Sequence, residues 1–455
     1  MRQLTVNQTS LIFAMLFTCQ VLTGQENPVT AEDRALIGKK PLEENILAAK
    51  REGGYFTGLP LINSDPDKGI GYGVRVNHFN NGTTDDRFFR YTPYLTKTFI
   101  QYFATTNGFQ YHTVDFDAPY FRGSPYRLRT SIIIGRNINA NYFGTGSETL
   151  ASLKAPNGQT YDTYEKYRKE LRKIESGSTY SYYNTFDMQK QTLKLTIDRD
   201  LWKALPIKLF VNLRIEEVGI KDYSGTQVLA SQGEKALMKT TKLKEDNDAG
   251  KIKGFSGGNN NALKLGLAYD SRDFEPDPRK GFFAELTYEW ANKTMGSVYD
   301  YQRLLLSKKV FFNPSPNLVF AMRTTYQTVE GNLPFYAYSR LGYIEGDVNG
   351  LGGLRSLRGF KDRRFVGSVM ALANIETRYQ LTQAMLGNQR FEFKLVPFLD
   401  WGTIADKQAI TELQDGRSSV GLGIRAAWNQ ATIIMIDYGT SPESSGLYIN
   451  FNHIF

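Results

Sequence analysis

The chain of 455 residues has a net charge of +9, a mean hydropathy of −0.40 and 13% aromatic residues, with 27 Tyr and 29 Phe against 4 Trp. No run of 18 or more uncharged apolar residues follows the N-terminus, so we expect no membrane-spanning helix. The basic residues are scattered without a basic helix or a nucleic-acid motif, so no nucleic-acid partner is expected. One large closed sheet fits this composition, because alternating lipid-facing and lumen-facing residues make a membrane barrel look polar on average.

The first 24 residues have the pattern of a secretory signal peptide. Arg2 supplies a positive start, Leu11–Phe17 form a compact apolar core, and cleavage is expected after Gly24. Cys19 is the only cysteine. If it leaves with the signal, the mature chain has no disulfide and no thiolate metal site. Cleavage before Cys19, as in a lipoprotein, is the alternative, which the preceding Phe-Thr pair disfavours.

Residues 25–68 are expected to form a short periplasmic segment, because they fall below the about 50 residues of a small separate domain. Leu42, Ile46 and Ala49 recur at helical spacing and predict a short amphipathic helix. Gly53-Gly54 would end it. Such a helix is a candidate plug for a barrel that follows.

From Gly69 to Phe455 the apolar residues recur with a period of two, as in residues 206–216 and 281–291. Runs of about ten such residues, separated by turns, are typical of strands that span a membrane. Sixteen runs can be distinguished, with the first centred near residue 74 and the second near residue 92. Short and long connections alternate, and the long ones are polar and expected to be solvated. The prediction is an all-β fold, a 16-stranded antiparallel transmembrane β-barrel over residues 69–455 with both termini in the periplasm.

One long connection is rich in glycine and arginine and precedes two strands that each carry an acid. By strand parity, Glu376 and Asp400 both face the lumen, because a charge on the lipid face costs about 2–4 kcal/mol at mid-depth for Arg or Lys. If the loop folds back into the barrel, Arg358 can lie against both acids, a pairing that suits a guanidinium better than an ammonium. A solvated external loop is the alternative that spacing alone leaves open.

Several motifs together resemble those of the BamA/TamA superfamily of outer-membrane barrels, which includes the TpsB transporters and the bacterial surface antigen barrels. Leu357-Arg358-Gly359-Phe360 resembles its Val/Ile-Arg-Gly-Phe/Tyr motif, with Leu357 as a mild departure. The other matching segments are Leu59–Gly73 at the first strand, Asp270-Ser271-Arg272-Asp273 at a turn, Asn374-Ile375-Glu376, and Phe398-Leu399-Asp400-Trp401-Gly402. Their order along almost the whole mature chain makes the resemblance specific.

The resemblance implies that the sixth external loop folds inwards and that Asp400 and Glu376 hold Arg358 as a latch. It also implies a weak seam between the first and last strands. The C-terminal strand would face lipid through Leu447, Ile449, Phe451, His453 and Phe455, as the signal read by the barrel-assembly machinery. Outer-membrane lipid and lipopolysaccharide are the other expected partners. Residues 25–68 are too few for a POTRA domain, so the chain resembles a short, POTRA-less member.

The sequence bears on three kinds of function. A barrel for protein translocation or insertion across or into the outer membrane follows from the motif set, and a plugged or gated pore for small solutes is the alternative. An enzyme is not expected, because His78, His112 and His453 have no serine or acid partner that the sequence places beside them. No metal or cofactor motif is present in the sequence. The sequence also does not identify a client protein or a solute.

Overall fold

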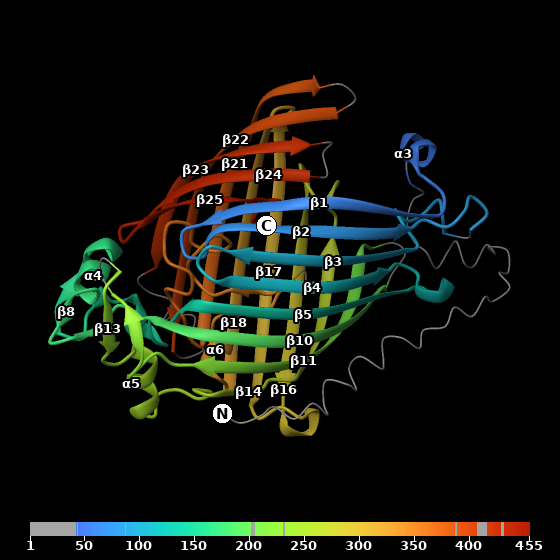
Figure 1. The fold of residues 1–455 in the computed structure, drawn as a ribbon. Helices are drawn as coiled ribbons and strands as arrows, with labels where there is room; N and C mark the ends of the chain where they lie inside the picture. Colours follow the sequence, from blue (N-terminus) through green and yellow to red (C-terminus); the bar gives the residue numbers. More distant parts are fainter. Residues whose placement is uncertain are drawn as a thin grey trace.

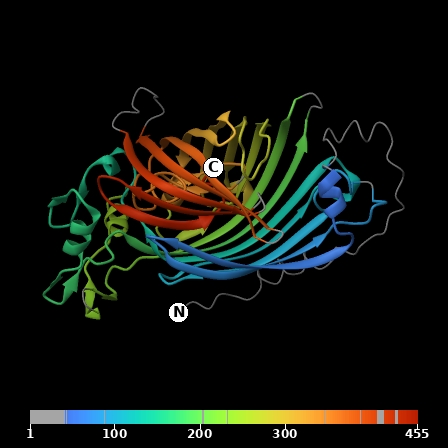
Figure 2. The same cartoon turned by 90° about the horizontal axis from the view of Figure 1, so that it is seen from above.

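The structure is a computed structural model that describes residues 42, 44–86, 88–201, 205–230, 233–344, 346–386, 389–406, 416–428 and 432–455. The predicted signal peptide, residues 1–24, lies outside these ranges. Within them, no helix is both long and apolar enough to cross a membrane. What the structure does contain is a large sheet of antiparallel strands that curls into a ring (Figures 1 and 2).

Sixteen strands form the wall, and neighbours along the chain pair in antiparallel register around the ring. They are β1 (Gly54–Asp65), β2 (Gly69–Asn80), β3 (Thr96–Thr105), β4 (Phe109–Ala118), β5 (Tyr126–Asn141), β10 (Thr185–Asp200), β11 (Ile207–Lys221), β15 (Ala262–Asp270), β16 (Gly281–Ala291), β17 (Asp300–Ser315), β18 (Leu318–Asn332), β21 (Val369–Leu386), β22 (Gln389–Ala405), β23 (Arg417–Trp428), β24 (Thr432–Thr440) and β25 (Ser445–Phe451). A short extra piece, β14 (Gly257–Asn259), extends the pairing of β11. The predicted sixteen-stranded all-antiparallel barrel is confirmed.

Side chains alternate along each wall strand as a membrane barrel requires. In β16, Leu286 and Tyr288 are exposed on the outer face, whereas Glu285, Thr287 and Glu289 are buried on the inner one. This is the reverse of a soluble sandwich, in which apolar residues point inwards. The polar face therefore lines the lumen, where charged groups can pair with one another away from lipid.

The prediction was wrong about where the barrel begins. The first strand is β1, which lies inside the segment assigned to the periplasmic tail, and residues 88–95 form turns rather than a strand. β1 is hard to recognise in the sequence because it contains Gly54, Gly58 and Pro60, residue types that are rare in strands. Pro60 is tolerated because β1 forms a full ladder only with β2, so its other edge behaves as an edge strand.

Residues 88–95 imitate a strand in the sequence because they are rich in aromatic side chains. In the structure Phe88 and Phe89 are buried in the β2–β3 connection, and Phe88 stacks on Tyr120 of the next periplasmic turn. One strand missed and one wrongly assigned leave the total at sixteen.

The predicted N-terminal helix is present as α3 (Glu44–Ala49). The Leu42 N–H donates to the carbonyl of Arg90, Lys50 Nζ donates to the carbonyls of Phe89 and Thr92, and Glu44 pairs with Arg90 at 2.8 Å. The side chains of Ile46 and Ala49 lie outside the described part of the structure. All these contacts are with the β2–β3 connection, at the periplasmic ends of the strands (Figure 1).

Two long external connections, residues 142–184 and 222–261, form an ordered cap rather than the solvated loops that the sequence suggested. The cap includes α4 (Tyr164–Leu171), α5 (Lys242–Asp248) and a small sheet that joins β8 (Ile174–Glu175), β9 (Ser178–Thr179), β12 (Gln227–Leu229) and β13 (Lys235–Met238). Its core contains Phe143, Tyr167, Leu171, Val228 and Met238. The cap lies at the end of the barrel opposite α3 (Figure 1).

Candidate functional site: the inward-folded loop and its ion network

The sixth external loop, residues 333–368, enters the barrel and packs there through an apolar core of its own. Its members from the loop and from the wall strands β17, β21 and β22 are Leu341, Tyr343, Val348, Leu351, Leu357, Phe360, Phe365, Leu305, Met370, Leu372 and Ile404. Phe360 and Phe365 meet edge to face at 5.1 Å. The loop is therefore part of the folded interior and is not solvated.

Arg358 lies at the centre of a buried ion network and has no exposed surface. Its Nε and Nη2 donate to the two carboxylate oxygens of Asp400, both at 2.8 Å. Its Nη1 donates to Glu376 at 2.9 Å and to Asp437 at 2.7 Å. The guanidinium carbon also lies 3.4 Å from the centre of the Phe398 ring. All three nitrogens of this cation thus have carboxylate acceptors, as a dry guanidinium requires.

Two further arginines balance the charge of the network. Arg378 pairs with Glu376 at 2.9 Å, and Arg425 contacts both Glu376 and Asp437. Three guanidinium groups therefore face three carboxylates. Such a buried network need not add net stability, because desolvation offsets the attraction, but it disfavours any arrangement that leaves one charge alone.

The backbone on either side of Arg358 is also fixed. The Arg358 N–H donates to Asp400 at 3.1 Å, the Gly359 N–H donates to the Tyr448 hydroxyl at 3.0 Å, and the Ser444 hydroxyl donates to the Gly359 carbonyl. Gly359 has a φ of 98°, and a Cβ there would lie 2.8 Å from the Thr440 carbonyl carbon. Only glycine meets both demands without strain.

The outer part of the loop is tied to its surroundings by further ion pairs. Arg364 forms a bidentate pair with Glu443, and Lys361 pairs at 2.8 Å with Asp67 in the β1–β2 turn. Burial alone would lower the pKa of Lys361, but the neighbouring Asp67 carboxylate outweighs it and raises this pKa. The loop therefore contacts both strands that meet at the closure of the barrel.

That closure, the β1–β25 seam, is weak. Across it the described strands share one register pair, Ser64 with Ile449, whereas β1 and β2 pair along their full lengths from Gly54–Asn80 to Asp65–Gly69. β25 ends at Phe451, so most of β1 runs past it towards the periplasm without a partner on that side (Figure 2).

The last residues differ from the prediction. Leu447 is exposed on the outer face and Ile449 and Phe451 are half-buried, but the strand stops there and Asn452, with a φ of 68°, turns the chain inwards. His453 and Phe455 therefore do not face lipid. Phe455 lies beside Phe311, and Arg323 and Arg378 lie over its ring, in the lumen.

His453 is buried against the periplasmic β15–β16 turn, where its Nε2 lies 3.0 Å from Asp277. Burial and the nearby Arg378 charge lower the pKa of His453 to about 4, although Asp277 opposes the shift. The imidazole is therefore neutral at neutral pH. The sequence placed no acid beside this histidine, and the structure supplies one from a distant turn.

The structure brings together Leu357, Arg358, Gly359, Asp400 and Glu376, as the sequence predicted for a loop that folds back. Sequence analysis missed Asp437 and Arg425. The signal for both was strand parity, because Asp437 alternates with the outward Ile436 and Tyr438, and Arg425 with the outward Ile424. A charge between lipid-facing neighbours must point into the lumen.

The comparisons with known proteins agree with this geometry. A family model described as the Omp85 superfamily domain matches residues 102–445. The chain belongs to the Omp85 superfamily. A second family model, a domain of unknown function called DUF5982, matches residues 33–95 and so covers α3 and the β1–β2 hairpin. No curated protein matches the chain.

Two solved structures illustrate the likeness. BamA from Haemophilus ducreyi lacking POTRA domains 1–3 is 12% identical with a TM-score of 0.52, over 89% of this chain and 70% of that one. CdiB from Escherichia coli is 11% identical with a TM-score of 0.53, over 87% of this chain and 62% of that one. This chain thus spans less than two thirds of that CdiB. At such identities the likeness concerns the fold alone, and it agrees with the antiparallel barrel.

Omp85 barrels belong to the bacterial outer membrane, and the family takes part in protein insertion and translocation rather than enzymatic chemistry. The resemblance drawn from the sequence motifs is therefore confirmed at the level of the superfamily.

Proposed function

We propose that this barrel inserts or translocates polypeptides at the outer membrane by opening the β1–β25 seam, while the Arg358 network holds the sixth loop in place as a latch. The observation that carries the proposal is the single register pair across the seam. All strand edges of the barrel apart from this seam are satisfied by a ladder with the neighbouring strand. An edge left open in lipid is a template on which an incoming strand can pair.

The latch and the seam are connected through the loop. Gly359 contacts β24 and, through Tyr448, β25, while Lys361 and Asp362 contact Asp67 beside β1. The loop therefore bridges the two sides of the closure. Arg358 anchors this bridge on β21, β22 and β24, away from the strand that would move.

The proposal also includes how the chain is exported and assembled into the outer membrane. Residues 1–24 direct the chain across the inner membrane, and the outward face of β25, through Leu447, Ile449 and Phe451, is read by the barrel-assembly machinery. Phe455 is excluded from that face because it lies in the lumen.

A small-solute pore is less well supported. The sixth loop places an apolar core and an ion network across part of the lumen, so a wide pore would require both to be dismantled. The short tail helix α3, the other candidate plug, contacts only the β2–β3 connection in its described interactions.

The test is a disulfide across the seam. Ser64 and Ile449 are direct partners, and facing Cα atoms in an antiparallel pair lie about 4.5–5.5 Å apart, within the range that a disulfide spans. The variant Ser64→Cys/Ile449→Cys, in a Cys19→Ser background, is expressed in a strain that lacks the native gene. Quantitative proteomics of the outer membrane and the medium then reports which proteins reach them.

We expect the oxidised variant to lose a defined set of outer-membrane or released proteins, and each single-cysteine variant to restore them. Full complementation by the oxidised variant would contradict seam opening. If loss of the gene changes solute uptake but no protein's location, the pore alternative is favoured instead.

A further inference from the structure

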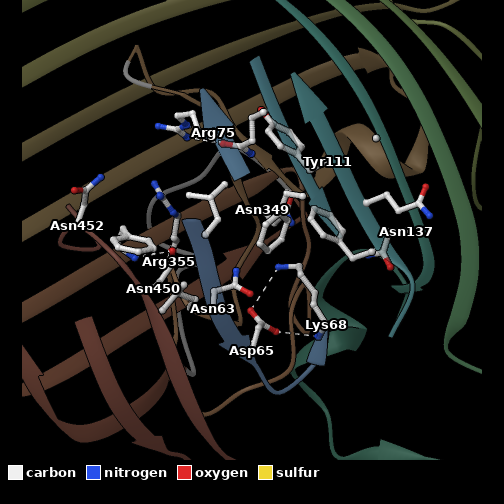
Figure 3. A pocket seen from close by; sticks show the side chains of 18 of the residues that line it. Asn63, Asp65, Lys68, Arg75, Tyr111, Asn137, Asn349, Arg355, Asn450 and Asn452 are labelled. Atoms are coloured by element: carbon white, nitrogen blue, oxygen red, sulfur yellow. Dashed lines mark hydrogen bonds and ion pairs between the residues drawn. The ribbon is translucent and has the colours of Figure 1, made fainter. Parts of the chain in front are cut away.

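A cavity of about 730 Å³ lies in the lumen between β1–β5 and the sixth loop (Figure 3). It is distinct from the latch, because Arg358, Glu376, Asp400 and Asp437 do not line it. Seven basic side chains line it against three carboxylates. This excess of positive charge, enclosed by low-dielectric walls, favours an anion inside.

Three of these cations have no ion-pair partner among the described residues. Arg75 donates only to the Gln101 amide oxygen, at 2.6 and 3.0 Å. Lys97 contacts aromatic rings, and its Nζ lies 5.6 Å from the centre of Phe99, the ring that Arg75 also approaches at 4.5 Å. Lys190 lines the opposite wall, on β10, and forms no ion pair with a carboxylate of the described residues. Arg75 and Lys97 repel each other across the Phe99 ring, and Asp115 compensates them only at longer range, without an ion pair.

A fourth cation has unused hydrogen-bond donors. Arg363 of the sixth loop is 9% exposed and lines the cavity, and its Nε and Nη1 have no hydrogen-bond partner. Its one ion pair, with Asp362, is long at 3.9 Å, and its φ of 58° is unusual for an arginine. Buried donors without acceptors cost free energy, so a ligand oxygen here would remove that cost.

The cavity extends to the seam. Leu59, Leu61 and Ile62 of β1 line it on one side, and Phe451 at the end of β25 lines it on the other. Ile62 is also 65% exposed on the outer face. The seam side of the cavity thus combines apolar side chains with the amides of Asn63 and Asn450, and the interior beyond it is cationic.

We propose that this cavity binds the phosphate-bearing headgroup of an anionic lipid, which enters through the seam while its acyl chains remain in the bilayer. Arg75, Lys97, Lys190 and Arg363 together supply the positive charge that attracts the phosphate, and amides such as Asn63 and Asn450, labelled in Figure 3, contact the rest of the headgroup. The pairing of apolar side chains at the seam with a basic interior matches an amphiphile better than a free anion. The inference does not depend on the proposed translocation, since a lipid can occupy the cavity of a barrel that moves no protein.

The test uses the full mature chain reconstituted in phosphatidylcholine vesicles. Electron paramagnetic resonance measures how strongly the protein immobilises spin-labelled phosphatidylglycerol relative to spin-labelled phosphatidylcholine. The variant is Arg75→Gln/Lys97→Gln/Lys190→Gln. The matched control, Lys208→Gln/Lys221→Gln/Lys308→Gln, removes the same charge from wall residues that do not line the cavity.

We expect the native chain and the control to select phosphatidylglycerol, and the cavity variant to lose that selectivity by about tenfold or more, because the three cations that favour the anionic headgroup are removed. Heat-dependent gel mobility verifies folding. If the triple variant fails to fold, Lys97→Gln alone replaces it, because Lys97 makes only ring contacts in the described structure, and a partial loss is expected.

Equal selectivity in all three proteins overturns the proposal. Displacement of the lipid by glycerol phosphate as effectively as by unlabelled phosphatidylglycerol overturns the lipid assignment in favour of a free phosphate compound. Stronger displacement by poly-glutamate overturns it in favour of an acidic polypeptide.

Discussion

Removing the Arg358 side chain tests the latch most quantitatively. In Arg358→Met the Asp400 carboxylate loses both guanidinium donors and keeps only the Asn374 amide, at 2.7 Å, and the backbone N–H of residue 358. Glu376 and Asp437, by contrast, still contact Arg378 and Arg425. One buried carboxylate is therefore left without a counter-ion.

The expected cost follows from this imbalance. Leaving a buried charge unpaired destabilises a protein by about 3–5 kcal/mol. Asp400→Asn alone costs less, about 1–3 kcal/mol, because Arg358 keeps Glu376 and Asp437. In the double variant two arginines again face two acids, so its cost is also about 1–3 kcal/mol. The two changes are thus expected to couple by at least about 1 kcal/mol, and by about 4 kcal/mol at the middle of these ranges.

Urea unfolding of the protein folded into lipid vesicles, followed by tryptophan fluorescence, gives the three free-energy differences. The reasoning is refuted if the single changes add to within about 0.5 kcal/mol in the double variant, the behaviour of sites that do not interact.

Three further outcomes are expected. Deleting residues 25–50, which spares β1, leaves single-channel conductance unchanged because α3 contacts the β2–β3 connection; a rise would make α3 a plug. Gly359→Ala lowers the free energy of unfolding by about 1–3 kcal/mol, because its Cβ would crowd Thr440 at a left-handed φ; an unchanged urea midpoint would contradict this. Since the pKa of His453 is lowered to about 4, the unfolded state binds its proton more readily. Stability should thus fall as pH drops from 6.5 to about 4, by up to about 3 kcal/mol, and His453→Gln should abolish this part of the pH dependence in unfolding titrations.

Much of the fold was predictable because the information is local. Period-two alternation marks each wall strand without reference to its partners, and strand parity alone places Glu376 and Asp400 in the lumen. The ordered motifs around Arg358 then indicated a loop that folds inwards. None of this needed knowledge of which strands lie opposite one another.

The errors arose where local pattern and tertiary context disagree. β1 contains Gly58 and Pro60, which normally interrupt strands. The edge of β1 at the seam is mostly unpaired, so the missing N–H donor of Pro60 breaks no ladder there. The aromatic residues near 92 alternate like a strand, yet Phe88 stacks on Tyr120 of another periplasmic turn and Phe89 lies under Lys50, which follows α3. Composition alone does not separate these two cases.

The network partners of Arg358 were only half predictable. That Asp437 faces the lumen follows from parity, but its distance from Arg358 depends on the path of a loop 79 positions away in sequence. The inward turn at Asn452 was equally hidden, because the groups that receive the tail, Arg323, Arg378 and Asp277, lie on distant segments.

Thiol labelling tests the inward position of the sixth loop most directly. Ser356, two residues before Arg358, is fully buried and is replaced by cysteine in a Cys19→Ser background. A membrane-impermeant maleimide is added outside intact cells, with Asn157→Cys in the exposed cap as the reactive control. We predict that Ser356→Cys is protected, and that adding Arg358→Met makes it reactive. Labelling of Ser356→Cys as fast as Asn157→Cys with Arg358 present would show the loop outside the barrel and contradict the account.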